Sequence, residues 1–272
     1  MSDVEQLCER YGFRIVRRLP DHGEASRRVL QVQAANGEMR VLKQTLASRA
    51  ANEIACLKAW NATKFTARLI DVLTPTCYLL EFVEGPTLAA TGGTSELRAV
   101  GNALRVLHNV EVPPALGGLF DLQEDKTKFL LLAEDVTGWD RLSPEQRRTA
   151  ADAVEQLRAH MAATEIVHGD LVPSNIILSP TGPRLIDPVG RQGSGVWDVA
   201  QLAVTFFGRF GEDCLPELLE GYGGALPMLR DMFVWMTLRY LQKNRAEGRP
   251  EFAERLDRLS RTEFPRHLRR GR

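Results

Sequence analysis

Several features that would assign a membrane, an export route or a charged partner are missing from this chain of 272 residues. Its longest apolar runs, such as residues 129–133, are far shorter than the roughly 18 residues of a membrane-spanning helix. The first residues are acidic and lack the basic and then apolar pattern of a secretory signal. Thirty-five Lys and Arg balance thirty-five Asp and Glu, so no charge excess favours nucleic acid or an anionic membrane as a partner.

Cysteine is scarce, and its spacing excludes two further classes of protein. The four residues, Cys8, Cys56, Cys77 and Cys214, are scattered and contain no Cys-x-x-Cys pair. This usage favours free thiols in a reducing compartment over disulfides or a zinc site. With 44% hydrophobic and 26% charged residues the composition is that of an ordinary globular protein. We therefore expect a soluble, cytoplasmic and monomeric protein of one large or two modest domains.

The most informative segment is the run from His168 to Asn175, together with a second acid further along. Asp170 precedes Asn175 by five positions, and Asp187 ends a short apolar strand twelve residues after that amide. A phosphoryl-transfer site needs this set, because one carboxylate orients the attacking hydroxyl while an amide and a second carboxylate hold magnesium. The alternative is a polar turn between a helix and a strand. The fixed spacing of several matching positions favours the catalytic interpretation.

The first third of the chain predicts a small antiparallel sheet followed by a helix. Residues 13–19 and 29–33 read as strands, and the turn Asn36-Gly37 leads into a third strand over 39–44. Lys43 lies near the end of that strand, and Glu53 follows ten residues later on a helix predicted over 47–60. An ion pair between them would aim the ammonium at nucleotide phosphates. The alternative is two unrelated surface charges.

Two further strands, over 69–73 and from 77, end at the turn Gly85-Pro86. Apolar residues before such a turn suit a hinge between two lobes, where backbone groups near Glu81 and Val83 could hydrogen-bond an adenine edge. The alternative is an edge strand followed by a turn.

The rest of the chain is predicted to be mainly helical around the catalytic loop. A helix opens at Ser95-Glu96, residues 111–123 form a loop, and Ser143 with Gln146 forms a capping box at a second helix start. Residues 176–178 and 184–186 form a hairpin that would place Asn175 and Asp187 at adjacent ends. Asp198, at the start of a later helix, either accepts hydrogen bonds from the catalytic-loop backbone or caps its own helix.

Together these residues resemble the aminoglycoside phosphotransferase family, which has the protein-kinase-like fold. The matching pieces are His168-Gly169-Asp170, Asn175, Ile186-Asp187 and Asp198-Val199-Ala200, and Lys43, Glu53 and residues 81–85 extend the match over about 13–205. The Ile-Asp-Pro variant at 186–188 is similar to streptomycin 6-kinases.

The resemblance implies an α+β, two-lobed fold, with a nucleotide-clamping sheet lobe at 1–85 and a helical lobe at 86–272. It implies a kinase that uses ATP or GTP with Mg²⁺, in which Asp170 is the catalytic base. By the same resemblance Asn175 and Asp187 would hold the metal, and Glu53 would hold Lys43 against the phosphates. His168 and Asp198 would support the catalytic loop.

Two departures bear on the nucleotide and the acceptor. The phosphate-covering loop contains one glycine, Gly23, so Ser26 or backbone amides would contact the phosphates instead. Only ten residues separate Asp187 from Asp198, and no Ala-Pro-Glu follows, which leaves no room for the activation segment of a protein kinase. The acceptor is therefore expected to be a small molecule.

The expected acceptor is an aminoglycoside or a related basic antibiotic, whose phosphorylation would confer resistance. The acids Glu212, Asp213, Glu217 and Asp135 would attract a polycation to the helical lobe, although solvated surface faces explain them equally well. Two alternatives remain open: a metabolic kinase for a sugar, choline or an amino alcohol, and a catalytically silent nucleotide-binding module. The last 65 or so residues match no motif.

Overall fold

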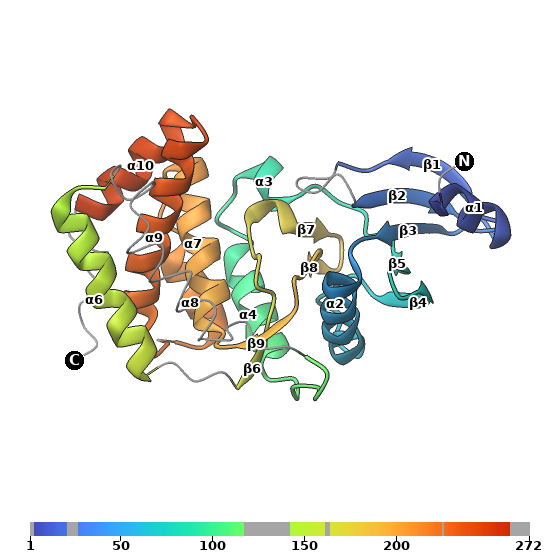
Figure 1. Ribbon diagram of the computed structural model, residues 1–272, viewed down its shortest axis with the longest axis horizontal. Helices are drawn as coiled ribbons and strands as arrows, with labels where there is room; N and C mark the ends of the chain where they lie inside the picture. The colour runs from blue at the N-terminus through green and yellow to red at the C-terminus, as the bar shows by residue number, and fades with distance from the viewer. Residues whose placement is uncertain (1–2, 21–26, 117–141, 161–163, 225, 262–272) are drawn as a thin grey trace.

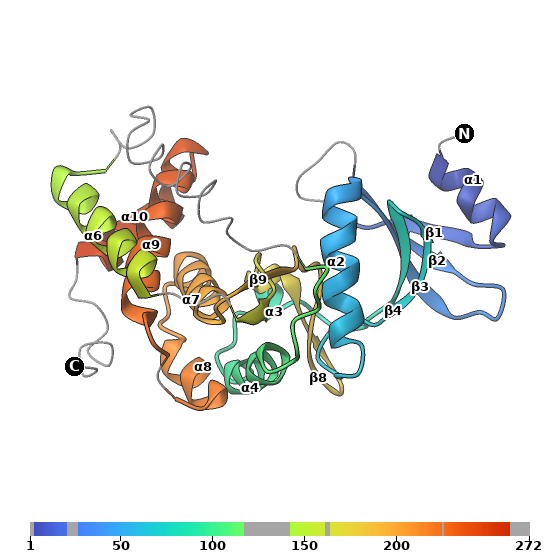
Figure 2. The same ribbon diagram turned by 60° about the horizontal axis from the view of Figure 1, so that its bottom comes forward.

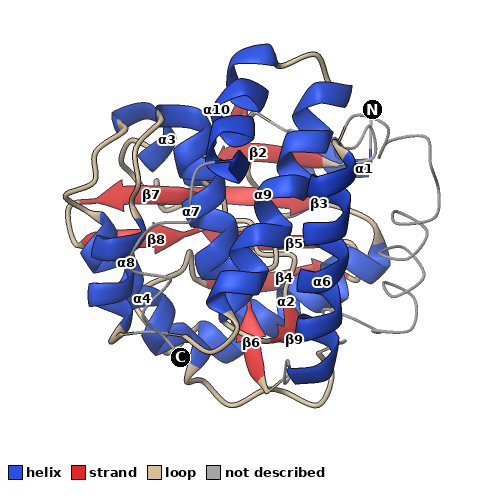
Figure 3. Ribbon diagram, turned by 90° about the vertical axis from the view of Figure 1, so that its left-hand side faces the viewer, coloured by secondary structure: helices blue, strands red, loops and turns tan. Residues whose placement is uncertain are grey.

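The computed structural model describes residues 3–20, 27–116, 142–160, 164–224 and 226–261. Figure 1 shows two lobes, with a small sheet at one end of the molecule and a group of helices at the other. Figure 3 looks onto the helical lobe, with the strands of the sheet behind it. The predicted two-lobed α+β architecture is confirmed. Within the described ranges, no helix is both long and apolar enough to cross a membrane.

The N-terminal lobe is built on one antiparallel sheet whose strands follow the order β1-β2-β3-β5-β4. The strands are β1 (Arg14–Arg18), β2 (Arg28–Gln33), β3 (Met39–Gln44), β4 (Leu69–Thr74) and β5 (Cys77–Glu81). β1, β2 and β3 pair consecutively, as predicted. Asn36 and Gly37 form the predicted turn between β2 and β3, where Gly37 has a φ of 85°.

A helix packs on each face of this sheet (Figure 2). Alternation along β3 sends Leu42 to the face covered by helix α1 (Asp3–Arg10), where it packs with Val4 and Cys8. Leu57 of helix α2 (Ala47–Trp60) packs on the opposite face. Lys43 follows Leu42 and points to the side of α2. The sequence predicted α2 and its bounds but missed α1.

The C-terminal lobe is mainly helical and encloses the largest apolar core. It contains α3 (Leu88–Thr91), α4 (Leu97–His108), α6 (Pro144–His160), α7 (Val196–Phe210), α8 (Leu215–Tyr222), α9 (Leu229–Ala246) and α10 (Pro250–Arg261). Most of α7 is buried in the centre of the lobe. Ser143 caps α6 as predicted, because its hydroxyl accepts from the Gln146 N–H while the Gln146 side chain accepts from the Ser143 N–H.

Short strands carry the segment 168–175 between the lobes. β6 (Glu165–Val167) pairs with β9 (Arg191–Gly193), and the predicted hairpin is formed by β7 (Ile176–Ser179) and β8 (Gly182–Leu185). The segment after α2 runs along β8, where Leu185 N–H donates to the carbonyl of Phe65 at 2.7 Å. The sheet lobe is therefore joined to the hairpin through the backbone.

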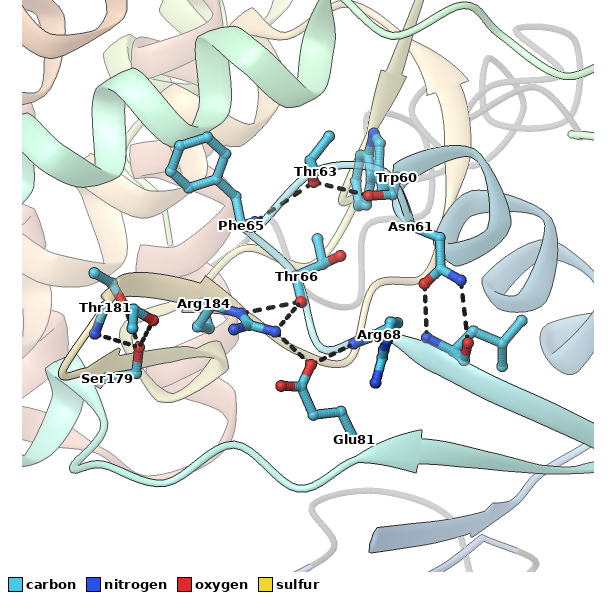
Figure 4. Close-up of polar contacts among 12 residues, drawn as sticks. Trp60, Asn61, Thr63, Phe65, Thr66, Arg68, Glu81, Ser179, Thr181 and Arg184 are labelled. Atoms are coloured by element: carbon cyan, nitrogen blue, oxygen red, sulfur yellow. Dashed lines mark hydrogen bonds and ion pairs between the residues drawn. The ribbon is translucent and has the colours of Figure 1, made fainter.

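A polar junction reinforces this connection (Figure 4). The Arg184 guanidinium donates to the Thr66 carbonyl, and it also pairs with the Glu81 carboxylate at the end of β5. Glu81 accepts from the Arg68 N–H as well. The side chain of Glu81 is thus occupied in joining β5, the post-α2 segment and β8.

The chain crosses from one lobe to the other at Gly85, where it passes closely over the β7–β8 hairpin. Gly85 has a φ of 141°, and a Cβ at this position would lie 2.3 Å from the Leu178 carbonyl oxygen. The adjacent Pro86 carbonyl accepts from the Leu178 N–H at 2.8 Å. Both the backbone conformation and the close approach require glycine here.

The close approach at Gly85 allows a prediction of how one added methyl group changes stability. Gly85→Ala should lower the free energy of unfolding by roughly 2–4 kcal/mol, because backbone strain and steric overlap add. Gly182→Ala is the matched control, since Gly182 also has a positive φ, 113°, but has nothing within 4 Å of an added Cβ. It should cost only about 1 kcal/mol of backbone strain. Urea denaturation measures both, and equal losses would contradict the close-packed crossing.

Candidate active site

Lys43 and Glu53 form the predicted ion pair between β3 and α2. Both carboxylate oxygens of Glu53 accept from the Lys43 ammonium. The side chains are 2% and 0% exposed. Isolated charges at such depth would cost several kcal/mol, so each requires the other. The pair fixes the ammonium at the end of β3 that faces the other lobe.

The same ammonium reaches Asp187, the second acid of the sequence motif. Lys43 and Arg27 both form ion pairs with Oδ1 of Asp187. Burial alone would raise the pKa of Asp187, but the charges of Lys43 and Arg27 and their hydrogen bonds lower it well below the usual range. Asp187 therefore stays ionised at neutral pH, between two cations from the N-terminal lobe.

The backbone at Asp187 is also unusual. Its φ is 63°, in the left-handed region that residues other than glycine rarely adopt, although aspartate tolerates it better than most. Such a conformation costs on the order of 1 kcal/mol and turns the chain sharply after β8. The turn directs the carboxylate toward Lys43.

The predicted catalytic loop, residues 168–175, is held in place by the buried carboxylate of Asp198. Its two oxygens accept from the backbone N–H groups of His168, at 2.7 Å, and Gly169, at 3.0 Å. Nε2 of His108 contacts the carboxylate at 3.0 Å, and Nδ1 of His108 contacts the Tyr222 hydroxyl at 2.9 Å. Of the two interpretations of Asp198, support of the catalytic-loop backbone is therefore the one observed.

His168 ties the loop to the strand that ends at Asp187. Its Nε2 lies 2.9 Å from the carbonyl of Ile186, so Nε2 carries the proton and donates. Nδ1 is then free to accept, and the Asp170 N–H lies 3.3 Å from it. One buried imidazole thus links the backbones of Asp170 and of the residue before Asp187.

Asn175 lies between the two acids, as the hairpin predicted. Its side-chain amide donates to the backbone carbonyl of Asp170 at 2.8 Å. The backbone carbonyl of Asn175 accepts from the Ile186 N–H at 2.9 Å. With Nδ2 committed as a donor, Oδ1 is the atom of Asn175 left for a cation. An amide oxygen and an ionised carboxylate are hard donors that suit Mg²⁺. Within the described ranges, no group of three or more His, Cys, Asp or Glu residues forms a metal site by itself.

Two residues of the site were missed by the sequence analysis. Arg27 reaches Asp187 across 160 positions of sequence, and no local pattern announces such a contact. Gln201 is buried in α7. Its side-chain oxygen, Oε1, accepts from the Leu171 N–H, and its side-chain nitrogen, Nε2, lies 3.5 Å from Oδ1 of Asp170. Its position three residues after Asp198 was the available signal, because that spacing puts both side chains on one face of a helix.

The remaining predicted residues include three of which the structure says nothing. Gly23, Ser26 and Asp135 lie outside the described residues. Val83 follows the end of β5. Residues 201–210 of α7 span roughly 14 Å along the helix axis, so the exposed Glu212 and Asp213, which follow α7 directly, lie at its far end from residues 168–175. Glu217 lies on α8, whose last residue, Tyr222, returns to His108 beside Asp198.

The cysteines take no part in this site. Cys8, Cys56, Cys77 and Cys214 are all unpaired and buried, which confirms the expectation of free thiols. Burial, with a smaller effect of Cys8, raises the pKa of the Cys77 thiol to about 11, so it stays protonated at neutral pH.

Comparison with known structures confirms the kinase-like architecture. An amicoumacin kinase, whose structure contains AMP-PNP, Ca²⁺ and amicoumacin, superposes with a TM-score of 0.67 at 13% identity, covering 98% of this chain and 97% of that one. A choline kinase from Streptococcus pneumoniae gives a TM-score of 0.65 at 16% identity, with 96% and 100% covered. At these identities the likeness establishes the fold alone.

Sequence comparison identifies the family. A probable ketoamine kinase of Vibrio parahaemolyticus is 32% identical over 115 residues, which are 39% of this chain. The chain matches only 38% of the length of that relative. A model of the phosphotransferase enzyme family matches residues 17–241. Because that match spans most of the chain, this protein belongs to the phosphotransferase enzyme family.

Proposed function

We propose that this protein transfers the γ-phosphoryl group of a magnesium-bound nucleoside triphosphate to a hydroxyl of a small molecule. The proposal rests on one observation: the Asp187 carboxylate, which follows the β7–β8 hairpin, pairs with cations of the N-terminal lobe. Lys43, held by Glu53, reaches Asp187, while His168 and Asn175 connect the strand before Asp187 to Asp170. These contacts support a site in which a cation, a metal-binding pair and a base would act together.

The nucleotide side of the site is formed by the N-terminal lobe. Lys43 and Arg27 are positive charges at fixed positions and suit the phosphate oxygens. Backbone groups around Glu81 and Val83 would meet the adenine edge where β5 leads into the crossing segment. Asp187 and Asn175 would hold Mg²⁺, which offsets charge on the phosphates when bound.

The acceptor side is formed by Asp170. This carboxylate would accept the proton of the acceptor hydroxyl, whose oxygen attacks the γ-phosphorus as the bond to the nucleoside diphosphate breaks. His168, Asp198 and Gln201 hold the loop in place, so little reorganisation is needed at the moment of reaction. A silent nucleotide-binding module has no use for such a base, and the complete set supports an active enzyme.

For the acceptor we propose a sugar-derived metabolite of the ketoamine type. The sequence relative described above is a probable ketoamine kinase, and its 32% identity over 115 residues supports this class. A polycationic antibiotic is the second candidate. It is favoured by the acidic segment at residues 210–229, which contains no Lys or Arg. The first acids of that segment, Glu212 and Asp213, lie at the far end of α7 from Asp170 and weaken this candidate, whereas its later part returns to His108 through Tyr222.

Two isosteric substitutions separate chemistry from nucleotide binding. Asp170→Asn should lower turnover about a hundredfold or more while nucleotide affinity stays within about twofold, because only proton transfer is lost. Asp187→Asn should instead weaken binding of the magnesium-nucleotide by about tenfold or more, a loss of roughly 1.4 kcal/mol. Calorimetric titration and steady-state kinetics measure both.

The matched control for this pair is Asp152→Asn. Asp152 is exposed on α6, in the C-terminal lobe. Its substitution should change neither turnover nor nucleotide affinity. Full turnover in Asp170→Asn would rule out the assigned base, and unchanged magnesium-nucleotide affinity in Asp187→Asn would rule out the assigned metal site.

An acceptor panel decides between the two acceptor classes. Purified protein is incubated with magnesium and either ATP or GTP, labelled at the γ-phosphate, together with fructosylated amines or with aminoglycosides. We expect label to enter the fructosylated amines. Transfer to the aminoglycosides, accompanied by resistance in a host that expresses the protein, would contradict the ketoamine proposal and support the antibiotic one.

A further inference from the structure

A cluster of side chains on two neighbouring helices reaches Asp170 through Gln201, and its other members have no role in the reaction described above. Gln201 and Trp197 come from α7, and Trp235, Arg239 and Tyr240 come from α9. The two helices pack against each other in the C-terminal lobe, as Figures 1 and 2 both show. The cluster is on the helical side of Asp170, opposite the lobe that supplies Lys43.

The orientation of the Gln201 amide follows from its hydrogen bonds. Its Oε1 accepts from the Leu171 N–H and from Nε1 of Trp197, both at 3.1 Å. Because an indole N–H and a backbone N–H only donate, the other end of the amide must be Nε2. That group donates to the Tyr240 hydroxyl at 2.8 Å and approaches Oδ1 of Asp170 at 3.5 Å.

Tyr240 is therefore left with a proton to donate. Its oxygen accepts from Gln201, so the hydroxyl hydrogen points to another group. Burial, with the nearby Asp170 as a smaller cause, raises the pKa of Tyr240, and the hydroxyl is a donor at neutral pH. A hydroxyl donor adjacent to the base is suited to the polar groups of an acceptor.

Arg239 adds a positive charge at a fixed position on the same side. Its guanidinium carbon lies 5.1 Å from the ring centroid of Trp235 and 5.6 Å from that of Trp197. Both indoles are buried, at 4% and 5% exposure, whereas Arg239 is exposed. Stacking on two indoles restricts the guanidinium while its N–H groups stay accessible to solvent and ligands.

A fixed cation next to Tyr240, whose hydroxyl is linked to Asp170 through Gln201, would select the charge of the acceptor. A polycation bound at Asp170 would be repelled by Arg239, whereas an anionic group would be attracted. One planar guanidinium matches one carboxylate through two parallel N–H···O bonds. A phosphate dianion would require further neutralising charge, so a carboxylate is the better fit.

We propose that Arg239 and Tyr240 bind the acceptor, and that this acceptor carries a carboxylate close to the hydroxyl that is phosphorylated. The proposal rests on the proposed function, because it assumes that the acceptor hydroxyl meets Asp170. It narrows the ketoamine class to conjugates that keep a free carboxylate, such as a sugar joined to the amino group of an amino acid.

The test compares two ligands that differ only in this group, N-fructosylglycine and N-fructosylglycinamide. Their binding is followed by tryptophan fluorescence in the presence of a non-hydrolysable ATP analogue, because Trp197 and Trp235 are two of the four tryptophans. We expect the acid to bind at least tenfold more tightly than the amide. In Arg239→Gln this preference should disappear, through weaker binding of the acid alone.

Arg230→Gln serves as the matched control, since Arg230 is another exposed arginine of α9 but lies near the start of the helix. It should keep the full preference for the acid. Arg239→Lys should retain part of it, because the charge remains while the planar fork is lost. Equal binding of acid and amide by the unaltered protein, no binding of either, or an equal loss for both in Arg239→Gln would overturn the proposal.

Kinetics on the same two ligands separate this proposal from the proposed function. If the acid is phosphorylated, Arg239→Gln should raise its KM about tenfold while kcat and the KM for nucleotide stay unchanged. If the acid binds with the expected preference but receives no phosphate, the anion site stands and the assigned reaction fails. If both ligands are phosphorylated with equal efficiency, the reaction stands and the carboxylate specificity fails.

Discussion

The ionised carboxylate of Asp187 is the point on which the whole site depends. It lies two residues after the β7–β8 hairpin, and two cations of the N-terminal lobe, Lys43 and Arg27, pair with its Oδ1. Lys43 is buried and requires Glu53, and Glu53 fixes α2 against the sheet. The position of the sheet lobe is thereby coupled to the position of the hairpin through charges that are too buried to be left unpaired.

The buried carboxylate of Asp198 fixes the position of the predicted catalytic loop, as Asp187 fixes the position of the two lobes. Asp198 accepts from two successive backbone N–H groups at the start of the loop, and its partner His108 is held in turn by Tyr222. Three residues further along α7, Gln201 contacts both the loop backbone and Asp170. One helix therefore supports Asp170, the proposed base, and the hairpin carries Asn175 and Asp187, the proposed metal-binding pair, at its ends.

The parts that the sequence predicted are those encoded by local spacing. The strand with Lys43, the helix with Glu53, the hairpin between Asn175 and Asp187 and the Ser143 capping box all follow from periodicity and turn chemistry within short segments. The contact of Asp198 with the loop backbone was predicted only as one of two alternatives, because it joins residues that are 30 positions apart in the sequence.

The parts that the sequence missed depend on contacts between distant segments. Arg27 meets Asp187 across 160 positions, and the Glu81 carboxylate pairs with Arg184 across 103. Glu212 and Asp213 lie far from Asp170 because of the length and direction of α7, and no local sequence pattern predicts that distance. The same holds for Arg239, whose place over two indoles arises only when α7 and α9 pack together.

The central claim is that this site moves a γ-phosphoryl group to a small molecule. The most direct measurement follows the fate of that phosphate when the protein is incubated with magnesium, a γ-labelled nucleotide and a deproteinised extract of small metabolites. Our account predicts that the label becomes covalently attached to a compound of the extract and that chelation of magnesium abolishes the transfer. Label that stays on the nucleotide, or that is released only as inorganic phosphate, would contradict it.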